Sequence, residues 1–312
     1  MENHPTLCRG TWLIAGCGYV GSRLARRRLS AGPVLALVRR AAAAEDLRRQ
    51  GIPAVLLDLD QTAPTAPRLL PPDLDALVYL APPSGTGTED LRLARFLGVL
   101  GAAHPEAFVY FSTTGVYGDT GGGPVDEDSP TAPREDRSRQ RLDAEWRVTQ
   151  WCQDRSVRCV LLRVPAIYGP YRLPLDRLQR LEPVLRAEDS GPGNRIHVDD
   201  LVDACLAGLE RPVEGVFNLT DGLPESMADF MARVASLAGL SAPPRITWAE
   251  AQRVLSPGLL SFLREARRVT SRRMQELGWT PRYGQPGAGI RASLAEMGLA
   301  VASKDGLSTG AR

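Results

Sequence analysis

The sequence has 312 residues, a formal net charge of +2 and a hydrophobic fraction of 43%. A chain of this length can bury a sizeable core without disulfides. Its arginines are spread among acidic residues and form no basic block, which argues against nucleic acid as a partner. There is no secretory signal pattern and no run of about 18 apolar residues. We therefore expect a cytoplasmic protein without membrane contact.

The cysteines are odd in number and irregularly spaced. They include no CxxC pair, which argues against both a disulfide framework and a zinc site. We expect reduced thiols and no metal. The five residues are Cys8, Cys17, Cys152, Cys159 and Cys205.

Short apolar runs alternate with helix-like segments over the first half of the chain, which is typical of βαβ units in a parallel sheet. The expected strands are 12–16, 34–38, 54–58, 76–81, 108–112 and 157–164, and the expected helices are 20–32, 43–51, 88–103 and 136–153. Segment 118–133 is rich in Gly, Pro and Asp and predicts an ordered surface loop or flap. The fold class predicted is α/β, a doubly wound parallel sheet of the Rossmann type.

The alternation loosens beyond about residue 170, where we expect a smaller C-terminal α+β lobe that holds the substrate. A helix over 197–210, a strand over 215–220 and a helix over 225–239 are predicted there. The expected division is a dinucleotide-binding domain over 1–170, to which part of 195–220 returns, and a substrate lobe over 171–300. The polar segment 303–312 predicts a disordered tail.

A glycine motif follows the first predicted strand and opens the first predicted helix. Gly16, Gly18 and Gly21 have GxGxxG spacing, with Cys17, Tyr19 and Val20 between them. In a dinucleotide site the first glycine permits a tight turn, the second lets the backbone approach a pyrophosphate, and the third lets helix and strand pack closely. The motif predicts cofactor binding; the alternative is a chance glycine-rich turn.

The end of the second predicted strand bears on the choice of dinucleotide. An NAD site usually has Asp or Glu about 20 residues past the glycine motif, where it binds the ribose 2′-hydroxyl. Arg39 and Arg40 stand there instead, and guanidinium groups pair well with phosphate. We therefore expect NADP as the preferred cofactor, with NAD possible. The alternative is a solvated arginine pair at a strand end.

Six motifs occur in a familiar order: GCGYVG, LLDLD, LVYLAPP, YFSTTGVYG, LRVPAIYGP and RIHVDDLVDA. Over about residues 10–295 the chain resembles the extended short-chain dehydrogenase/reductase superfamily, and more closely its atypical NAD(P)-dependent epimerase/dehydratase-like members. The resemblance implies that Asp58 and Leu59 border the adenine. It also implies that Thr113 is the catalytic Ser/Thr, although a strand-end hydroxyl often only satisfies local backbone. The residues implied to line the rest of the cofactor are Leu80, Ala81, Pro82 and the Pro165 to Ile167 turn.

The stretch RSRQR (137–141) departs from that family. Relatives that transfer hydride carry Tyr-x-x-x-Lys on this helix, and counting back from Glu145 puts Arg137 in the tyrosine slot and Arg141 in the lysine slot. Arginine stays protonated and cannot be the acid/base. Arg141 can still bind the ribose hydroxyls, and Arg137 can bind an anion or stabilise developing negative charge. The alternative is a solvated helix start, with Arg141 and Glu145 as a surface ion pair.

Another group must carry the proton if proton transfer occurs. Tyr117, Tyr168 and Tyr171 lie beside predicted strand ends. The ordinary pKa of His197 suits proton transfer, and the alternative is that this residue fixes a helix N-terminus. Dehydratases of the family have an acidic pair after the catalytic Ser/Thr, and Thr114 and Gly115 stand there, which disfavours sugar dehydration.

We therefore expect an NADP-binding oxidoreductase-like enzyme that acts on a small anionic metabolite or a nucleotide sugar. The rival from another class is a catalytically silent NADP(H)-binding sensor or scaffold. A homodimer is possible, since many relatives pair through helices of the large domain.

Overall fold

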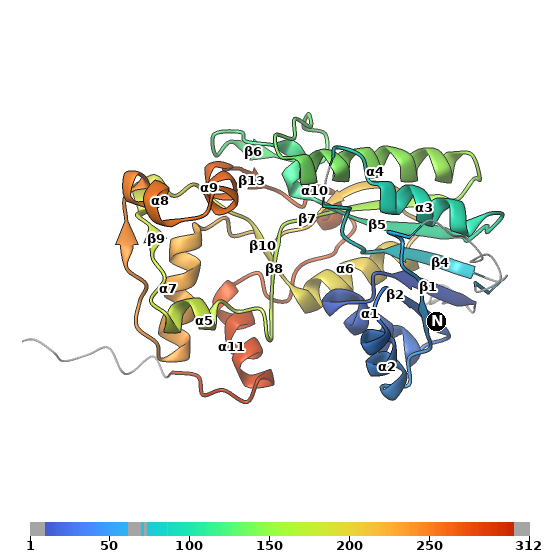
Figure 1. The fold of residues 1–312 in the computed structure, drawn as a ribbon, viewed down its shortest axis with the longest axis horizontal. Helices are drawn as coiled ribbons and strands as arrows, with labels where there is room; N and C mark the ends of the chain where they lie inside the picture. The colour runs from blue at the N-terminus through green and yellow to red at the C-terminus, as the bar shows by residue number, and fades with distance from the viewer. Residues whose placement is uncertain (1–9, 62–69, 72–73, 86, 303–312) are drawn as a thin grey trace, which may run out of the picture.

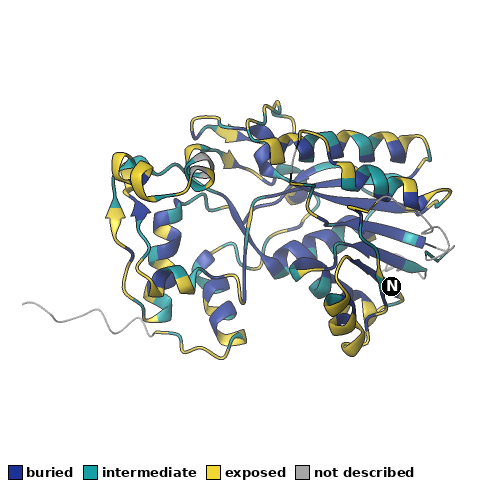
Figure 2. Ribbon diagram, viewed as in Figure 1, coloured by how far each residue is buried: buried dark blue, intermediate teal, exposed yellow. Residues whose placement is uncertain are grey.

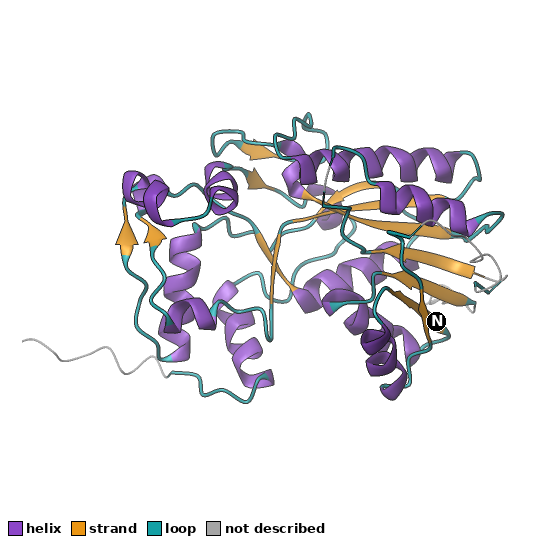
Figure 3. Cartoon of the chain, viewed as in Figure 1, coloured by secondary structure: helices purple, strands orange, loops and turns teal. Residues whose placement is uncertain are grey.

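A computed structural model describes residues 10–61, 70–71, 74–85 and 87–302 (Figure 1). The predicted tail over 303–312 and Cys8 lie outside these ranges. A central sheet of seven parallel strands organises the fold, as the α/β prediction requires (Figure 3). In spatial order the strands are β11 (Gly215–Asn218), β7 (Arg158–Val164), β5 (Ala107–Thr113), β4 (Leu74–Tyr79), β1 (Thr11–Ala15), β2 (Val34–Val38) and β3 (Ala54–Leu56).

The central strands are buried on both faces, which explains their nearly continuous apolar sequences. In β5 every residue before Thr113 is buried. Figure 2 shows the strands as a dark blue core between two helical layers. Successive side chains point to opposite faces, so one strand supplies two cores: Val109 packs in the core under one layer, and Phe108 and Tyr110 in the core under the other.

Helices cover both faces of the sheet (Figure 1). On one face lie α1 (Tyr19–Leu29), α2 (Ala41–Arg49), α6 (Val198–Glu210) and α10 (Arg272–Glu276). On the other lie α3 (Leu91–Leu100) and α4 (Asp136–Gln153). None of the helices in the described ranges combines the length and apolarity needed to cross a bilayer.

Several predicted elements end elsewhere than the sequence pattern indicated. The predicted helix over 88–103 begins only at Leu91, because the Asp90 side chain accepts a hydrogen bond from Leu93 N (3.0 Å) and caps it. It ends at Leu100, where Gly101 has φ +54°. The third and fourth strands end two residues early, at Leu56 and Tyr79.

The smaller lobe packs around a core of its own, which includes Phe230, Met231 and Leu294. Its elements are α5 (Leu175–Gln179), β9 (Val184–Leu185), α7 (Met227–Ala238), β12 (Arg245–Ile246), α8 (Trp248–Val254), α9 (Pro257–Arg264) and α11 (Pro286–Glu296). The chain crosses to it through β8 (Ala166–Tyr168), with which β10 (Arg195–His197) pairs in parallel. The chain then returns to the large domain. There α6 packs on one face of the seven-stranded sheet, and β11 forms an edge strand of it.

The Gly/Pro/Asp-rich flap contains a short strand, which the sequence pattern did not predict. Here β6 (Pro124–Val125) pairs with β13 (Arg268–Val269), far along the chain. Thr120 N and Gly122 N donate to Ala266 O (3.1 and 2.9 Å), and Arg267 Nε donates to Gly118 O (2.6 Å). The flap is therefore fixed to the segment that leads into β13.

Candidate active site

The glycine loop between β1 and α1 has the geometry of a phosphate site. Gly16 has φ +86°, and a Cβ there would lie 2.4 Å from Ala81 N, so only glycine fits. A Cβ at Gly18 would meet nothing within 4 Å, so its backbone faces open space. A Cβ at Gly21 would lie 3.1 Å from Gly16 O, where helix and strand pack. No acidic residue occupies the first turn of α1, so the residues present fit a dinucleotide pyrophosphate.

A hollow of about 240 Å³ adjoins this loop. Both arginines after β2, Arg39 and Arg40, line it, together with Leu59, Ala81 and Pro82. Cys17 also lines it, and burial raises the pKa of its thiol to about 12, so the thiol is neutral. The predicted cofactor residues of the loop and of the strand ends after β2, β3 and β4 thus meet at one place.

Gly21, described above, does not line this hollow, and neither do the predicted cofactor residues Asp58, Val20, Leu80 and Tyr19. Asp58 turns back on its own loop, where its Oδ1 accepts from Asp60 N (3.0 Å). Val20 and Leu80 pack against the core. Tyr19 Oη donates to Pro170 O (2.8 Å), which ties α1 to the turn after β8.

Arg92, on the first turn of α3, lines the same hollow and was not predicted from the sequence. Its Nη1 donates to Pro82 O (3.0 Å) and Pro83 O (2.9 Å). Its Nε and Nη2 donate to the two carboxylate oxygens of Asp60, each at 2.6 Å. The residue joins the loops after β3 and β4.

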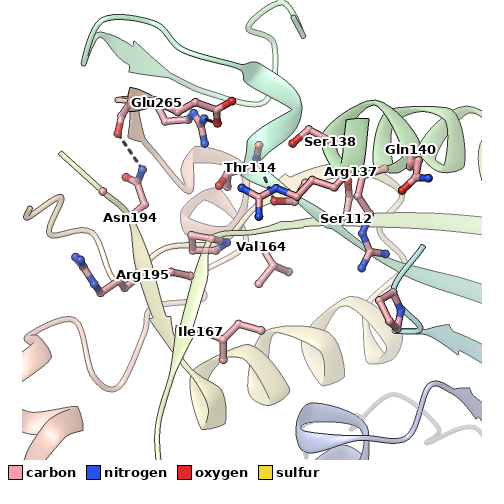
Figure 4. A pocket seen from close by; sticks show the side chains of 18 of the residues that line it. Ser112, Thr114, Arg137, Ser138, Gln140, Val164, Ile167, Asn194, Arg195 and Glu265 are labelled. Carbon is pink, nitrogen blue, oxygen red and sulfur yellow. Dashed lines mark hydrogen bonds and ion pairs between the residues drawn. The ribbon is translucent and has the colours of Figure 1, made fainter. Parts of the chain in front are cut away.

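A larger cavity of about 590 Å³ lies at the carboxyl ends of β4, β5 and β7. Pro82 lines both hollows, so they adjoin. Thr113, Arg137, Arg141, Pro165 and Ile167, all predicted as site residues, line the cavity. In Figure 4, Arg137 extends from the start of α4 toward Thr114, beyond the end of β5. This is the crevice in which open α/β sheets bind ligands.

Thr113 ends β5 with its side chain at the cavity. Its Oγ1 accepts from Gly115 N (3.1 Å) and caps the 3₁₀ turn Thr114–Tyr117. Because the hydroxyl oxygen takes this bond, its proton can be donated to a substrate oxygen. The capping role and a site role are therefore compatible.

Arg141 is anchored at the cavity edge. Its Nη1 lies within hydrogen-bond distance of Tyr110 Oη (3.1 Å), Phe111 O (3.0 Å) and Ala81 O (3.3 Å). Arg137 is exposed on the first turn of α4, and its guanidinium is also permanently charged. Both slots of the replaced motif thus place guanidinium groups in the cavity wall.

The alternative interpretation, in which Arg141 and Glu145 form a surface ion pair, is wrong. Glu145 is buried, and its carboxylate makes a two-pronged ion pair with Arg163 of β7 (Nη2–Oε2 2.7 Å, Nε–Oε1 3.0 Å). Ser112 Oγ also donates to Glu145. The helix position that follows Arg141 by one turn points into the protein, so its carboxylate needs a buried cation.

Tyr117 belongs to the same buried network and does not line the cavity. Arg163 Nη1 donates to Tyr117 Oη (2.9 Å), which donates to Asn218 Oδ1 (2.8 Å). Burial raises the pKa of Tyr117. Its hydroxyl thus serves to connect β7 with β11.

His197 is buried at the N-terminus of α6, away from the cavity wall. Its Nδ1 accepts from Asp199 N (3.2 Å), and its Nε2 lies 3.1 Å from Ser293 Oγ. Burial lowers its pKa to about 4, so the ring is neutral at physiological pH. These contacts favour the helix-fixing interpretation. Tyr168 is likewise buried, and Tyr171 is exposed, and neither lines the cavity.

The cavity wall includes charged and polar residues that the sequence reading missed. The wall includes Arg195 of β10 and Asn194 just before it. It also includes Glu265 and Arg267 from the segment before β13. Glu265 and Arg267 form an ion pair. In Figure 4 the Arg195 guanidinium points away from Arg137, and it donates to Glu225 O (2.9 Å) and Ser226 O (3.3 Å). In the sequence, only the RIHVDD motif pointed to this region. Glu265 and Arg267 come to the cavity from a distant part of the chain, so no local pattern predicted them.

The cavity wall in the described part of the chain contains four arginines and two carboxylates, Asp136 and Glu265. It contains no Tyr, His, Lys or Cys. Nor do the described residues include a group of His, Cys, Asp and Glu side chains that could hold a metal ion. The wall therefore carries more positive than negative side chains, and among its described residues there is no His or Cys, the residue types whose ordinary pKa values lie nearest 7.

Comparison with known proteins identifies related sequences. The sequence model of the NAD dependent epimerase/dehydratase family matches residues 12–220. The 3-diazoavenalumate denitrifying reductase of a Streptomyces species is 30% identical over 131 residues, which are 40% of this chain and 43% of that protein. The chain thus matches less than half the length of this curated relative.

Solved structures match nearly the whole chain. A conserved protein of unknown function from Silicibacter pomeroyi is 29% identical, with a TM-score of 0.78 over 92% of this chain and 99% of that one. The UDP-glucuronic acid 4-epimerase of Bacillus cereus, solved with NAD, is 18% identical, with a TM-score of 0.73 over 92% and 98%. At the latter identity the likeness is one of fold.

Proposed function

Because this chain belongs to the NAD dependent epimerase/dehydratase family, we propose that it is an NADP(H)-dependent oxidoreductase that acts on a small anionic metabolite or a nucleotide sugar. The observation that carries the proposal is the pair of adjoining hollows at the carboxyl edge of the sheet. One is lined by the glycine loop with Arg39 and Arg40, and the other by Thr113 with Arg137. The nicotinamide, when bound, supplies or accepts the hydride.

The side chains around the larger cavity would stabilise charge and would not transfer protons. In a reduction, negative charge develops on the substrate oxygen that loses its π bond. Thr113 would donate its hydroxyl proton in a hydrogen bond to that oxygen, and Arg137 would stabilise the charge. Arg141 would bind ribose hydroxyls. Since the described wall has no Tyr, His, Lys or Cys, the proton would reach the oxygen from water.

The cationic cavity wall supports an anionic substrate, because a guanidinium group recognises carboxylate or phosphate with two parallel hydrogen bonds. The Streptomyces relative is named a reductase, which supports reduction over epimerisation. Arg39 and Arg40 in the smaller hollow support NADP, because no carboxylate in the described lining is available to bind a ribose 2′-hydroxyl.

The proposal is tested with a matched pair of aldehydes, 4-formylbenzoate and its methyl ester, by following NADPH absorbance. We expect the carboxylate to be reduced about tenfold more efficiently (~1.4 kcal/mol). Arg137→Gln should remove that preference, and Thr113→Val should lower kcat on both aldehydes. Arg139→Gln, on the same helix but bonded to Asp136, is the control and should change neither. Equal turnover of the acid and the ester by the wild type would contradict an anionic substrate.

The described cavity wall lacks the Tyr and Lys of the family motif and contains no His or Cys, which favours a second candidate, a silent NADP(H)-binding sensor. The double variant Arg137→Tyr, Arg141→Lys distinguishes the two. A wild type that binds NADPH without oxidising it, together with a double variant that gains turnover, supports the sensor. Turnover by the wild type excludes it.

A further inference from the structure

Asp60 lies between two guanidinium groups beside the smaller hollow. Arg92 approaches it side-on with two hydrogen bonds of 2.6 Å, and Arg39 Nη1 lies 3.1 Å from Oδ2. The three residues come from the loop after β3, the first turn of α3 and the end of β2. Both oxygens of Asp60 are thus engaged by cations that border the hollow.

This arrangement neutralises the carboxylate that lies beside the hollow. A ribose 2′-hydroxyl needs an acceptor such as Asp or Glu, and the described lining of the hollow contains neither. Asp60 is the carboxylate bonded to that lining, and Arg92 occupies one lone pair on each of its oxygens. The Arg92 side chain is only 16% exposed, so its pairing is less screened by solvent than that of Arg39, which is 55% exposed.

We propose that Arg92 determines specificity for NADP over NAD by neutralising Asp60, so that Arg39 and Arg40 are left to bind a 2′-phosphate. This inference rests on the proposed NADP(H) function. The four side chains Arg39, Arg40, Arg92 and Asp60 carry a formal charge of +2, against about −1.5 to −2 on a phosphate monoester. Without Arg92 the sum is +1, and Arg39 is then the partner of the Asp60 carboxylate and less free to bind the phosphate.

Arg40 has no carboxylate within ion-pair distance among the described residues, and its backbone begins α2. The amide groups of that helix N-terminus add to the positive potential. Arg39 and Arg40 are therefore the arginines that meet the phosphate, and Arg92 acts through Asp60.

Arg92 also holds the Pro82 and Pro83 carbonyls, so its removal can weaken both cofactors alike. Asp60→Asn is free of that problem, because the amide oxygen still accepts from Arg92 while the negative charge is lost. Arg95→Gln is the matched control. Arg95 is on the same helix, and its Nη1 donates to Leu59 O (2.8 Å) but does not bond Asp60.

The experiment is calorimetric titration of the wild type, Asp60→Asn, Arg92→Gln, the double variant and Arg95→Gln with NADPH and with NADH. We expect the ratio of the NADH Kd to the NADPH Kd to rise about threefold or more in Asp60→Asn and to fall about tenfold (~1.4 kcal/mol) in Arg92→Gln. The double variant should return toward the wild-type ratio, and Arg95→Gln should leave it unchanged.

The experiment distinguishes a failure of the proposed cofactor from a failure of the proposed role of Arg92. A wild type that binds NADH as well as NADPH overturns the proposed cofactor. A wild type that prefers NADPH, with the same ratio in Asp60→Asn and in Arg92→Gln, overturns the role of Arg92 alone. The role of Arg92 is also overturned if Arg92→Gln weakens the binding of NADPH and NADH equally while Asp60→Asn leaves the ratio of the two Kd values unchanged. Arg92 would then only hold the loop after β4 in place.

Discussion

Replacement of Arg163 by Met tests the buried network behind the cavity. Arg163 and Glu145 are 7% and 5% exposed, and two hydrogen bonds join them. Arg163→Met keeps an apolar side chain of similar length but leaves the Glu145 carboxylate with Ser112 as its remaining side-chain donor. Removing one partner of a buried ion pair costs about 3–5 kcal/mol, because the other charge stays buried and unpaired.

We therefore expect the free energy of unfolding to fall by about 3–5 kcal/mol, and Tm by roughly 6–20 °C at about 2–4 °C per kcal/mol. Equilibrium urea unfolding and thermal denaturation, both followed by circular dichroism, measure these changes. The control is Arg139→Gln, which breaks a surface pair with Asp136 whose side chains are 47% and 64% exposed. It should cost less than about 0.5 kcal/mol.

The double variant Arg163→Met, Glu145→Leu removes both charges and should recover much of the stability lost in the single variant. A loss below about 1 kcal/mol in Arg163→Met would refute the reasoning, since an unpaired buried carboxylate cannot cost so little.

The other predictions concern the glycine loop and His197. Gly16→Ala should destabilise the fold, because its Cβ would lie 2.4 Å from Ala81 N at φ +86°. Gly18→Ala should leave Tm unchanged while weakening NADPH binding at least tenfold (~1.4 kcal/mol); a Gly18→Ala chain that binds normally would contradict the phosphate site. His197 has its pKa lowered by burial to about 4, against an ordinary value of 6.5. Its contribution to stability is therefore complete above about pH 6.5 and is lost as the pH falls through about 4. His197→Asn, which can still cap α6, should reduce that acid sensitivity in urea unfolding. If the NMR signal of the His197 imidazole titrates near pH 6.5, the reasoning is wrong.

Local sequence rules predicted the features that depend on neighbouring residues. The apolar strands, the GxGxxG turn and the helix over 136–153 follow from patterns within a few residues. The family resemblance, and not a local pattern, implied one site for Thr113, Arg137 and Arg141, and all three residues line one cavity.

Features that depend on distant parts of the chain could not be predicted in this way. Glu145 meets Arg163 rather than Arg141, because the direction of a helix face is set by the sheet on which it packs. Arg92 reaches Asp60 across the edge of the sheet, and β13 pairs with β6 from the far end of the sequence. No local pattern encodes such pairings.

The central claim is that the two adjoining hollows bind NADP(H). The most direct test is calorimetric titration of the wild-type chain with NADPH and NADH at one ionic strength. We expect NADPH to bind with micromolar affinity and NADH to bind at least about tenfold more weakly (~1.4 kcal/mol). If neither dinucleotide binds, the account of the site is contradicted.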